Sequence, residues 1–270
     1  MNQPRTWTFV DETFVPEAVL PVTDRGVRYG MSVFETIAVR AGEPLFIQEH
    51  LQRLAEACRA AEFIFPEKLS EIAIRALLTE TTDSVLRIYV SAGDGHPSAP
   101  VTASRTFLML EETTFPSELE LAHGWRVILS RVPFPAILGG WKTGNYWSSV
   151  QALQEAKREG GQEAIVLNAQ GAVISASMGN VFFVKQGRLI TPPLIMGARD
   201  GVLRSWVMQQ SVVEEELLSV DDLGEMEECF ITNSRIGVMP VSTLAESLLP
   251  SREHGLKLSL LYRESIFIAR

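Results

Sequence analysis

The sequence has few of the features of secreted, membrane-bound or metal-binding proteins. It contains two cysteines, Cys58 and Cys229, far apart and without Cys-x-x-Cys spacing. Two such thiols argue against a disulfide scaffold or a metal site and favour a cytoplasmic protein. No apolar run approaches the ~18 residues of a membrane span, and the N-terminus lacks the apolar core of a signal peptide. We therefore expect no membrane partner and no metal.

Positive charge is also in deficit. Lys and Arg number 24 against 33 Asp and Glu, which gives a net charge of −9. A chain of this balance has no general attraction for nucleic acid, so we expect no nucleic-acid partner. An anionic ligand must instead be held by a local group of donors. The apolar share of 46% and the charged share of 21% are those of a globular protein.

Several familiar catalytic motifs are missing. The sequence has no Gly-x-Ser-x-Gly, His-Glu-x-x-His or Gly-x-Gly-x-x-Gly. The stretch from Gly139 to Thr143 is superficially similar to a phosphate loop, but no glycine directly precedes Lys142. The histidines are scattered, and we predict that each is a surface or packing residue: His50, His96, His123 and His254.

The hydrophobic pattern predicts two α+β domains. The first alternates strands with amphipathic helices, in which apolar residues recur every three or four positions. The second is richer in short antiparallel strands joined by glycine turns. An acidic stretch separates them, so we expect a small N-terminal domain over 1–113, a linker over 114–124 and a larger domain over 125–270. The expected strands are 7–10, 33–39, 86–91, 106–110, 126–129, 163–167, 172–175, 181–185, 188–191 and 228–233, and the expected helices are 48–63, 66–79, 146–159 and 199–210.

Lys142 is a candidate nucleophile. It lies in the apolar and aromatic stretch 137–147. A lysine among apolar groups loses hydration of its ammonium, so its pKa falls and the amine can attack carbonyls. The alternative is an ordinary solvated loop lysine, which composition alone favours.

A series of motifs along nearly the whole chain resembles the fold-type IV pyridoxal phosphate enzymes, the class IV aminotransferases. This family includes branched-chain and D-amino acid aminotransferases and aminodeoxychorismate lyase. The resemblance implies a two-domain fold like that of D-amino acid aminotransferase. The matching motifs, in order, are DRGVRYGMSVFETI (24–37), HLQRL (50–54), WKTGNY (141–146), GAVI with GNVF (171–182), TPPL (191–194), GVLR (201–204) and TNS with MPV (232–241).

The resemblance also implies roles for individual residues. Lys142 matches the lysine that joins covalently to pyridoxal 5'-phosphate and moves the substrate proton. Arg53 matches the arginine that grips the cofactor phosphate, a role that suits a guanidinium fork. Further cofactor contacts fall on the amides of Val202 and Leu203, which start a helix. The hydroxyls of Ser234 and Tyr146 complete this set.

The substrate contacts are implied more loosely. Arg87 lies where some relatives hold the substrate carboxylate, and Tyr29 is a second candidate. Both would serve a small amino substrate, in a family whose active site lies near the interface of a homodimer. We therefore expect a homodimer.

One position departs from the family pattern. The resemblance places a glutamate against the cofactor's pyridine nitrogen, and this chain has Ser175 there. We therefore expect a lyase resembling aminodeoxychorismate lyase, which gives pyruvate and 4-aminobenzoate. The alternatives are an aminotransferase acting on branched-chain or D-amino acids, and a cofactor-binding relative without activity.

Overall fold

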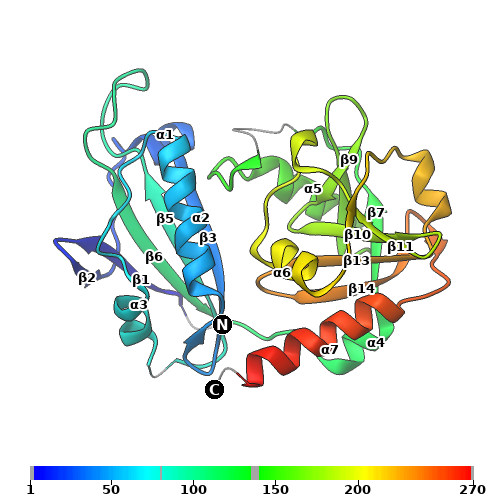
Figure 1. Cartoon of the computed structure of the whole chain (residues 1–270). Helices are drawn as coiled ribbons and strands as arrows, with labels where there is room; N and C mark the ends of the chain where they lie inside the picture. Colours follow the sequence, from blue (N-terminus) through cyan, green and yellow to red (C-terminus); the bar gives the residue numbers. More distant parts are fainter. Residues whose placement is uncertain (1–2, 80, 135–139, 269–270) are drawn as a thin grey trace. The chain divides into compact units, whose positions relative to one another are not determined.

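The computed structural model describes residues 3–79, 81–134 and 140–268, and the chain divides into two compact units (Figure 1). Unit 1 comprises Met1–Phe115 and Trp141–Asn145, and unit 2 comprises Pro116–Gly140 and Tyr146–Arg270. The stretch 114–124, expected to be a linker, contains helix α4 (Glu118–His123), which belongs to unit 2. The boundary between the units, after Phe115, falls within that stretch. Ser117 and the side chain of Glu120 form a capping box that starts the helix in the rest of it.

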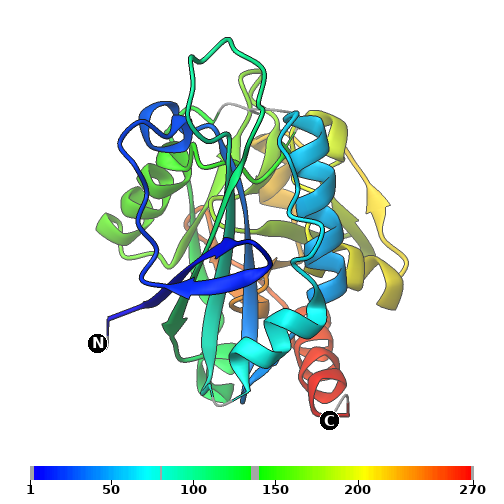
Figure 2. The same ribbon diagram turned by 90° about the vertical axis from the view of Figure 1, so that its left-hand side faces the viewer.

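Unit 1 is built on a six-stranded sheet in the order β2-β1-β6-β5-β3-β4, in which each neighbouring pair is antiparallel. Figure 2 shows this sheet face-on with the long helix α2 along one side of it. The elements are β1 (Arg5–Val10), β2 (Thr13–Pro16), α1 (Arg25–Tyr29), β3 (Ser32–Arg40), β4 (Glu43–Pro44), α2 (Ile47–Ala60), α3 (Glu71–Leu78), β5 (Ser84–Ser91) and β6 (Arg105–Glu112).

The core of unit 1 lies between this sheet and its helices. Leu54 and Cys58 of α2 pack with Ile37 of β3 and Ile88 of β5, all fully buried. The four-three spacing of apolar residues on α2 therefore has the role that the sequence predicts. The short segment Trp141–Asn145 lies along β3, as the Phe34 amide donates to the Lys142 carbonyl at 2.9 Å.

Unit 2 contains a nine-stranded sheet in the order β12-β11-β10-β13-β14-β7-β8-β9, with β15 paired to β14. The pairs β14–β7, β7–β8 and β11–β12 are parallel, so the sheet is mixed rather than purely antiparallel. Its strands are β7 (Trp125–Leu129), β8 (Glu163–Leu167), β9 (Val173–Ala176), β10 (Asn180–Lys185), β11 (Arg188–Thr191), β12 (Glu214–Glu215), β13 (Glu228–Asn233), β14 (Gly237–Leu244) and β15 (Ser247–Leu248).

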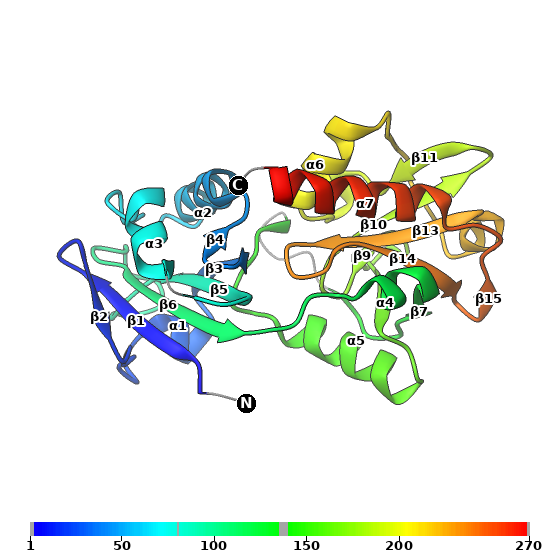
Figure 3. The ribbon, with the colours of Figure 1, turned by 90° about the horizontal axis from the view of Figure 1, so that it is seen from below.

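Three longer helices pack on the sheet of unit 2: α5 (Trp147–Arg158), α6 (Val202–Gln210) and α7 (Glu253–Ile268). Helix α5 contributes Ala152 and Ala156 to a core shared with β7, β8 and β9. Helices α6 and α7 contact β13, and α7 also lies along β14, as Figure 3 shows. None of the helices in the described part of the chain is long and apolar enough to cross a membrane.

Candidate active site

Lys142 is held in unit 1 by backbone pairing with β3. The Phe34 amide donates to its carbonyl, and the Gly144 amide donates to the Ser32 carbonyl at 2.8 Å. The Lys142 Nζ atom lies over the ring of Phe34, 4.1 Å from its centroid. The amine of this half-buried residue therefore contacts an aromatic face supplied by β3, outside its local sequence. Residues 135–139, part of the same apolar stretch, lie outside the described residues.

Glu35 on β3 binds two residues of α2. Its carboxylate accepts hydrogen bonds from Nε and Nη2 of Arg53, each at 2.7 Å, and lies 2.8 Å from His50 Nδ1. Side chains alternate along β3, so Glu35 faces the same side as Val33 and Ile37, the side that packs in the core of unit 1. The side chains of Glu35 and His50 are 2% and 1% exposed, and that of Arg53 is 16% exposed. Arg53 is thus a paired, mostly buried residue.

These contacts set the ionisation states of Glu35, His50 and Arg53. Burial raises the pKa of Glu35, but the Arg53 charge and the hydrogen bonds from His50 and Arg53 outweigh it and hold that pKa well below its usual range. Burial also lowers the pKa of His50 below its ordinary value of 6.5. An ionised carboxylate can only accept hydrogen bonds, so Nδ1 of His50 carries the hydrogen. At neutral pH the three residues are an anion, a cation and a neutral imidazole.

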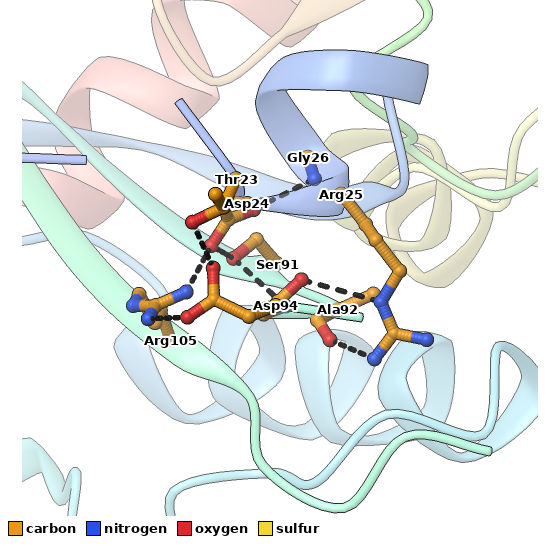
Figure 4. A network of polar contacts seen from close by, with 9 residues as sticks. Thr23, Asp24, Arg25, Gly26, Ser91, Ala92, Asp94 and Arg105 are labelled. Carbon is orange, nitrogen blue, oxygen red and sulfur yellow. Dashed lines mark hydrogen bonds and ion pairs between the residues drawn. The ribbon is translucent and has the colours of Figure 1, made fainter. Parts of the chain in front are cut away.

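The start of helix α1 is fixed by Asp24 and Arg25. The Asp24 carboxylate caps α1 through the Gly26 amide at 2.7 Å and accepts from Ser91 at 2.8 Å and from Arg105 at 2.9 Å (Figure 4). Asp24 is fully buried, so these partners supply the hydrogen bonds that water cannot.

Arg25 ties the same helix to the loop after β5. Arg25 is 1% exposed, and its guanidinium donates to the carbonyls of Ala92 at 2.5 Å and Gly93 at 3.2 Å (Figure 4). It also donates to the carbonyl of Ala99 at 2.9 Å. Tyr29, the last residue of α1, is therefore held on an anchored turn while its side chain is 40% exposed.

Arg87 lies elsewhere on unit 1. Its neighbours on β5, Leu86 and Ile88, belong to the core under the helices, so Arg87 points to the opposite face of the sheet. It forms an ion pair with Glu111 on β6. Arg87 therefore lies on the face opposite Glu35, which is the face of Phe34, the residue over whose ring the Lys142 Nζ atom lies.

In unit 2 the start of α6 has no side-chain cap. The residue before it is Gly201, which offers no side chain to cap the helix. The amides of Val202 and Leu203 belong to the first turn and have no acceptor within the helix. A Cβ at Gly201 would lie 2.0 Å from Asn180 Oδ1, so a larger residue here would displace the Asn180 side chain. The helix starts at Val202 rather than at Arg199, where the sequence predicted it.

Thr232 on β13 lies beside this helix start. It pairs with Asn180 on β10, so the two side chains lie on the same face of the sheet. Thr232 is 1% exposed, and its Oγ1 atom has no hydrogen-bond partner within the described part of the chain. Ser234, two residues on, directly follows the end of β13 and is half-buried.

Tyr146 precedes α5, and Arg199 lies next to it. The Arg199 Nη1 atom donates to the Tyr146 hydroxyl at 3.4 Å, and the guanidinium carbon is 5.7 Å from the tyrosine ring centroid. Asn180 fixes the Arg199 backbone by donating to its carbonyl at 2.7 Å. Sequence reasoning missed Arg199, because no pattern marks it.

Ser175 is a buried residue of β9, with 8% exposure. The nearest carboxyl along the neighbouring strand is Glu163 on β8. That carboxyl accepts from the amides of Ala164 at 2.8 Å and Met178 at 3.3 Å and from the Ser177 hydroxyl. Burial raises the pKa of Glu163. The hydrogen bonds of the Glu163 carboxyl thus hold the turn after β9 and do not hold the Ser175 side chain.

The predicted residues therefore fall into two groups. Lys142 and Arg53 lie in unit 1, and the residues at the starts of α5 and α6, with Ser175 and Ser234, lie in unit 2. Sequence reasoning missed Glu35, Arg199 and Thr232 and interpreted His50 only as a surface or packing residue.

Comparison with known proteins gives the same family that the motifs indicate. The profile of the amino-transferase class IV family matches residues 32–244. An aminodeoxychorismate lyase from Vibrio harveyi is 27% identical over 243 residues, which are 86% of this chain and 89% of that protein. A crystal structure of 4-amino-4-deoxychorismate lyase from Pseudomonas aeruginosa is 28% identical, with a TM-score of 0.84 over 97% of this chain and 99% of that one.

A third relative has another activity. A T.th. branched-chain amino acid aminotransferase, solved with pyridoxamine 5'-phosphate, is 26% identical, with a TM-score of 0.87 over 98% of this chain and 95% of that one. The similarity extends over both units, which confirms the expected two-domain α+β fold. The chain belongs to the class IV aminotransferase family.

Proposed function

We propose that this protein is a pyridoxal 5'-phosphate-dependent lyase of the aminodeoxychorismate lyase type. The cofactor follows from the family and from a relative that was solved with pyridoxamine 5'-phosphate. The relatives divide between lyases and aminotransferases at similar identity, so they support the class and not the reaction. The observation that carries the lyase assignment is Ser175, a buried hydroxyl at the position where the family pattern places a carboxylate.

The residues of the site fit the cofactor's phosphate. The start of α6 offers amides to an anion, and the buried Thr232 hydroxyl lacks a partner within the described residues. The tight approach of Gly201 to Asn180 keeps side chains out of this place. Arg53, Val202, Leu203 and Ser234 would hold the phosphate, and Tyr146 would hold the ring oxygen.

Lys142 is the residue that does the chemistry. When bound, pyridoxal phosphate supplies an aldehyde for the amine and a ring that accepts electrons released at the substrate carbon. The Lys142 amine would take the proton from that carbon, because release from the aldehyde leaves the amine beside it. Phe34 covers one side of this amine and limits its hydration.

Ser175 favours elimination over amino-group transfer. A hydroxyl can donate a hydrogen bond to a ring nitrogen, but it cannot hold a proton there at neutral pH. Without that proton the cofactor ring would withdraw electrons less strongly. Elimination depends less on electron withdrawal by the ring, because the departing group carries away the negative charge as its bond to the substrate breaks. For aminodeoxychorismate, loss of the proton and of the side chain as pyruvate leaves aromatic 4-aminobenzoate.

Two other functions are the alternatives. An aminotransferase acting on branched-chain or D-amino acids is favoured by the Lys142–Tyr146 motif, although Arg87, its candidate carboxylate ligand, is paired with Glu111. A cofactor-binding relative without turnover would also explain Ser175. Retention of Lys142 argues against that, since binding alone needs no lysine at this position.

One substrate panel separates the three functions. The purified holoprotein is offered aminodeoxychorismate, L-leucine and D-alanine, with Lys142→Ala as the inactive control. Pyruvate and 4-aminobenzoate from aminodeoxychorismate alone support the lyase. Keto acid formed from L-leucine or D-alanine supports an aminotransferase, and bound cofactor with no product supports the inactive relative.

A homodimer in the cytoplasm is part of the same proposal. Val33 and Phe34 are buried inside unit 1 and are not free to form an interface. The support comes instead from exposed apolar residues before and within α1: Val19, Val22, Val27 and Tyr29. The free, buried Cys58 and Cys229 suit a reducing compartment. A monomeric mass by light scattering would contradict the dimer.

A further inference from the structure

We propose that Glu35 is a positioning residue that, together with His50, fixes the guanidinium of Arg53 for the cofactor phosphate. This inference rests on the proposed function only in the role that it gives Arg53. It adds two residues, from β3 and α2, to the phosphate site.

The contact is a planar one. Glu35 takes the Nε hydrogen and one Nη2 hydrogen of Arg53, both at 2.7 Å, so the carboxylate and the guanidinium form a side-on pair. Such a pair fixes the plane of the guanidinium and the direction of its Nη1 edge. An arginine that nothing held in place would have to give up its rotamer freedom when the phosphate binds. Because Glu35 already fixes the Arg53 rotamer, that loss of conformational entropy does not fall on phosphate binding.

His50 holds the carboxylate in turn. Its Nδ1 atom donates to the Oε2 atom of Glu35 at 2.8 Å, and both side chains are almost wholly buried. The strand fixes one end of the Glu35 side chain and the helix fixes the other. Because His50 and Arg53 lie one turn apart on α2, a single carboxylate can bind both.

The charge balance makes the proposal testable. Glu35 neutralises Arg53, and neutral His50 adds no charge, so the trio carries no net charge at neutral pH. Replacing Glu35 with glutamine removes the negative charge and leaves the trio with a net positive charge. If charge alone mattered, Glu35→Gln would strengthen phosphate binding. If position matters, it weakens binding, because glutamine offers one oxygen where three N–H donors need two.

The experiment measures the affinity of full-length apoprotein for pyridoxal 5'-phosphate and for pyridoxal, which lacks the phosphate. The variants are Glu35→Gln, Arg53→Gln and the double variant. Glu71→Gln is the control, because Glu71 pairs with Arg75 Nε at 2.8 Å in the same unit but at the surface. We expect Glu35→Gln to weaken binding of the phosphorylated ligand about 10-fold, within the range of a charge-assisted hydrogen bond, with pyridoxal unchanged. We expect the control to change neither affinity.

The double variant shows whether Glu35 acts through Arg53. With Arg53→Gln in place, Glu35→Gln should not change the ratio of the two affinities further. An unchanged or tighter affinity for pyridoxal phosphate in Glu35→Gln would overturn the inference, as would an equal loss for both ligands. If Arg53→Gln leaves the ratio unchanged, the proposed phosphate site itself is wrong.

A second variant covers the case in which Glu35→Gln does not fold. Glu35→Asp keeps the charge but withdraws the carboxylate by one methylene, so it should weaken pyridoxal phosphate binding in the same direction. Wild-type affinity in Glu35→Asp would overturn the positioning role.

Discussion

Acid should weaken unit 1 through His50, and the change His50→Asn should remove the effect. His50 is 1% exposed, and burial is the main reason why its pKa lies below the ordinary value of 6.5. Between that lowered pKa and pH 6.5, the unfolded chain binds a proton that the folded chain does not. The free energy of unfolding therefore falls as the pH falls through this window.

The magnitude follows from one proton. A single group contributes at most about 1.4 kcal/mol per pH unit, so acidification from pH 6.5 to pH 5 costs at most about 2 kcal/mol. Glu35 acts in a lower window. Its pKa is held below its usual range, so its contribution is complete above its ordinary value of 4.5 and is lost as the pH falls below that value. The other histidines, His96, His123 and His254, are exposed.

The assay is urea unfolding of the apoprotein at pH 7.5, 6.5, 5.5 and 5.0, followed by circular dichroism. Asparagine can still donate to Glu35 but does not titrate, so His50→Asn should be less stable at pH 7.5 and lose the part of the slope that His50 contributes. Glu163, whose pKa burial raises, acts with the opposite sign and equally in both proteins. An equal slope in the two proteins would refute the reasoning, since it would place the proton uptake at another group.

The remaining predictions concern the site and the cysteines. Borohydride reduction of the holoprotein should attach the cofactor to Lys142, and a label on another lysine in the peptide map would contradict the assignment. Ser175→Glu should leave pyruvate release unchanged or slower and raise keto acid formation from amino acids; a wild type that already transfers amino groups efficiently would contradict this. Burial raises the pKa of Cys58 to about 12 and that of Cys229 well above its ordinary value. Neither thiol should react with Ellman's reagent at pH 8 until the protein is unfolded, and a fast native reaction would count against that burial.

The elements that the sequence predicted well have a clear apolar pattern. Helix α2 carries apolar residues every three or four positions, because one face of it is buried in the core of unit 1. Strands β3 and β5 are short apolar segments that are buried along most of their length. Helix α7 was missed, since Leu258 and Tyr262 are buried while Leu260 and Leu261 are exposed. Its apolar residues surround the helix and give no period. Helix α1 has five residues, too few for any pattern.

Non-local strand pairing accounts for another difference between the expected domain division and the structure. Sequence order placed Lys142 in the C-terminal domain, but the segment Trp141–Asn145 pairs with β3 and clusters with unit 1. Backbone pairing between residues about a hundred positions apart leaves no local signal. The motifs could therefore identify Lys142 as the reactive lysine without indicating that Phe34 lies beneath its amine.

Glu35 was within reach of sequence reasoning, whereas Thr232 and Arg199 were not. Alternation along β3 places Glu35 on the same face as Val33 and Ile37, and a carboxylate on a buried face needs a partner. The next helix supplies His50 and Arg53, one turn apart, so the pattern already directs Arg53 toward the sheet. For Thr232 a buried strand threonine is ordinary, and only its hydroxyl beside the start of α6, unpaired within the described residues, marks the position. Residues that pair with each other, such as Glu35 and Arg53, can be inferred from the sequence pattern. A buried hydroxyl that lacks a hydrogen-bond partner within the described residues can be recognised only when its neighbours in the structure are known.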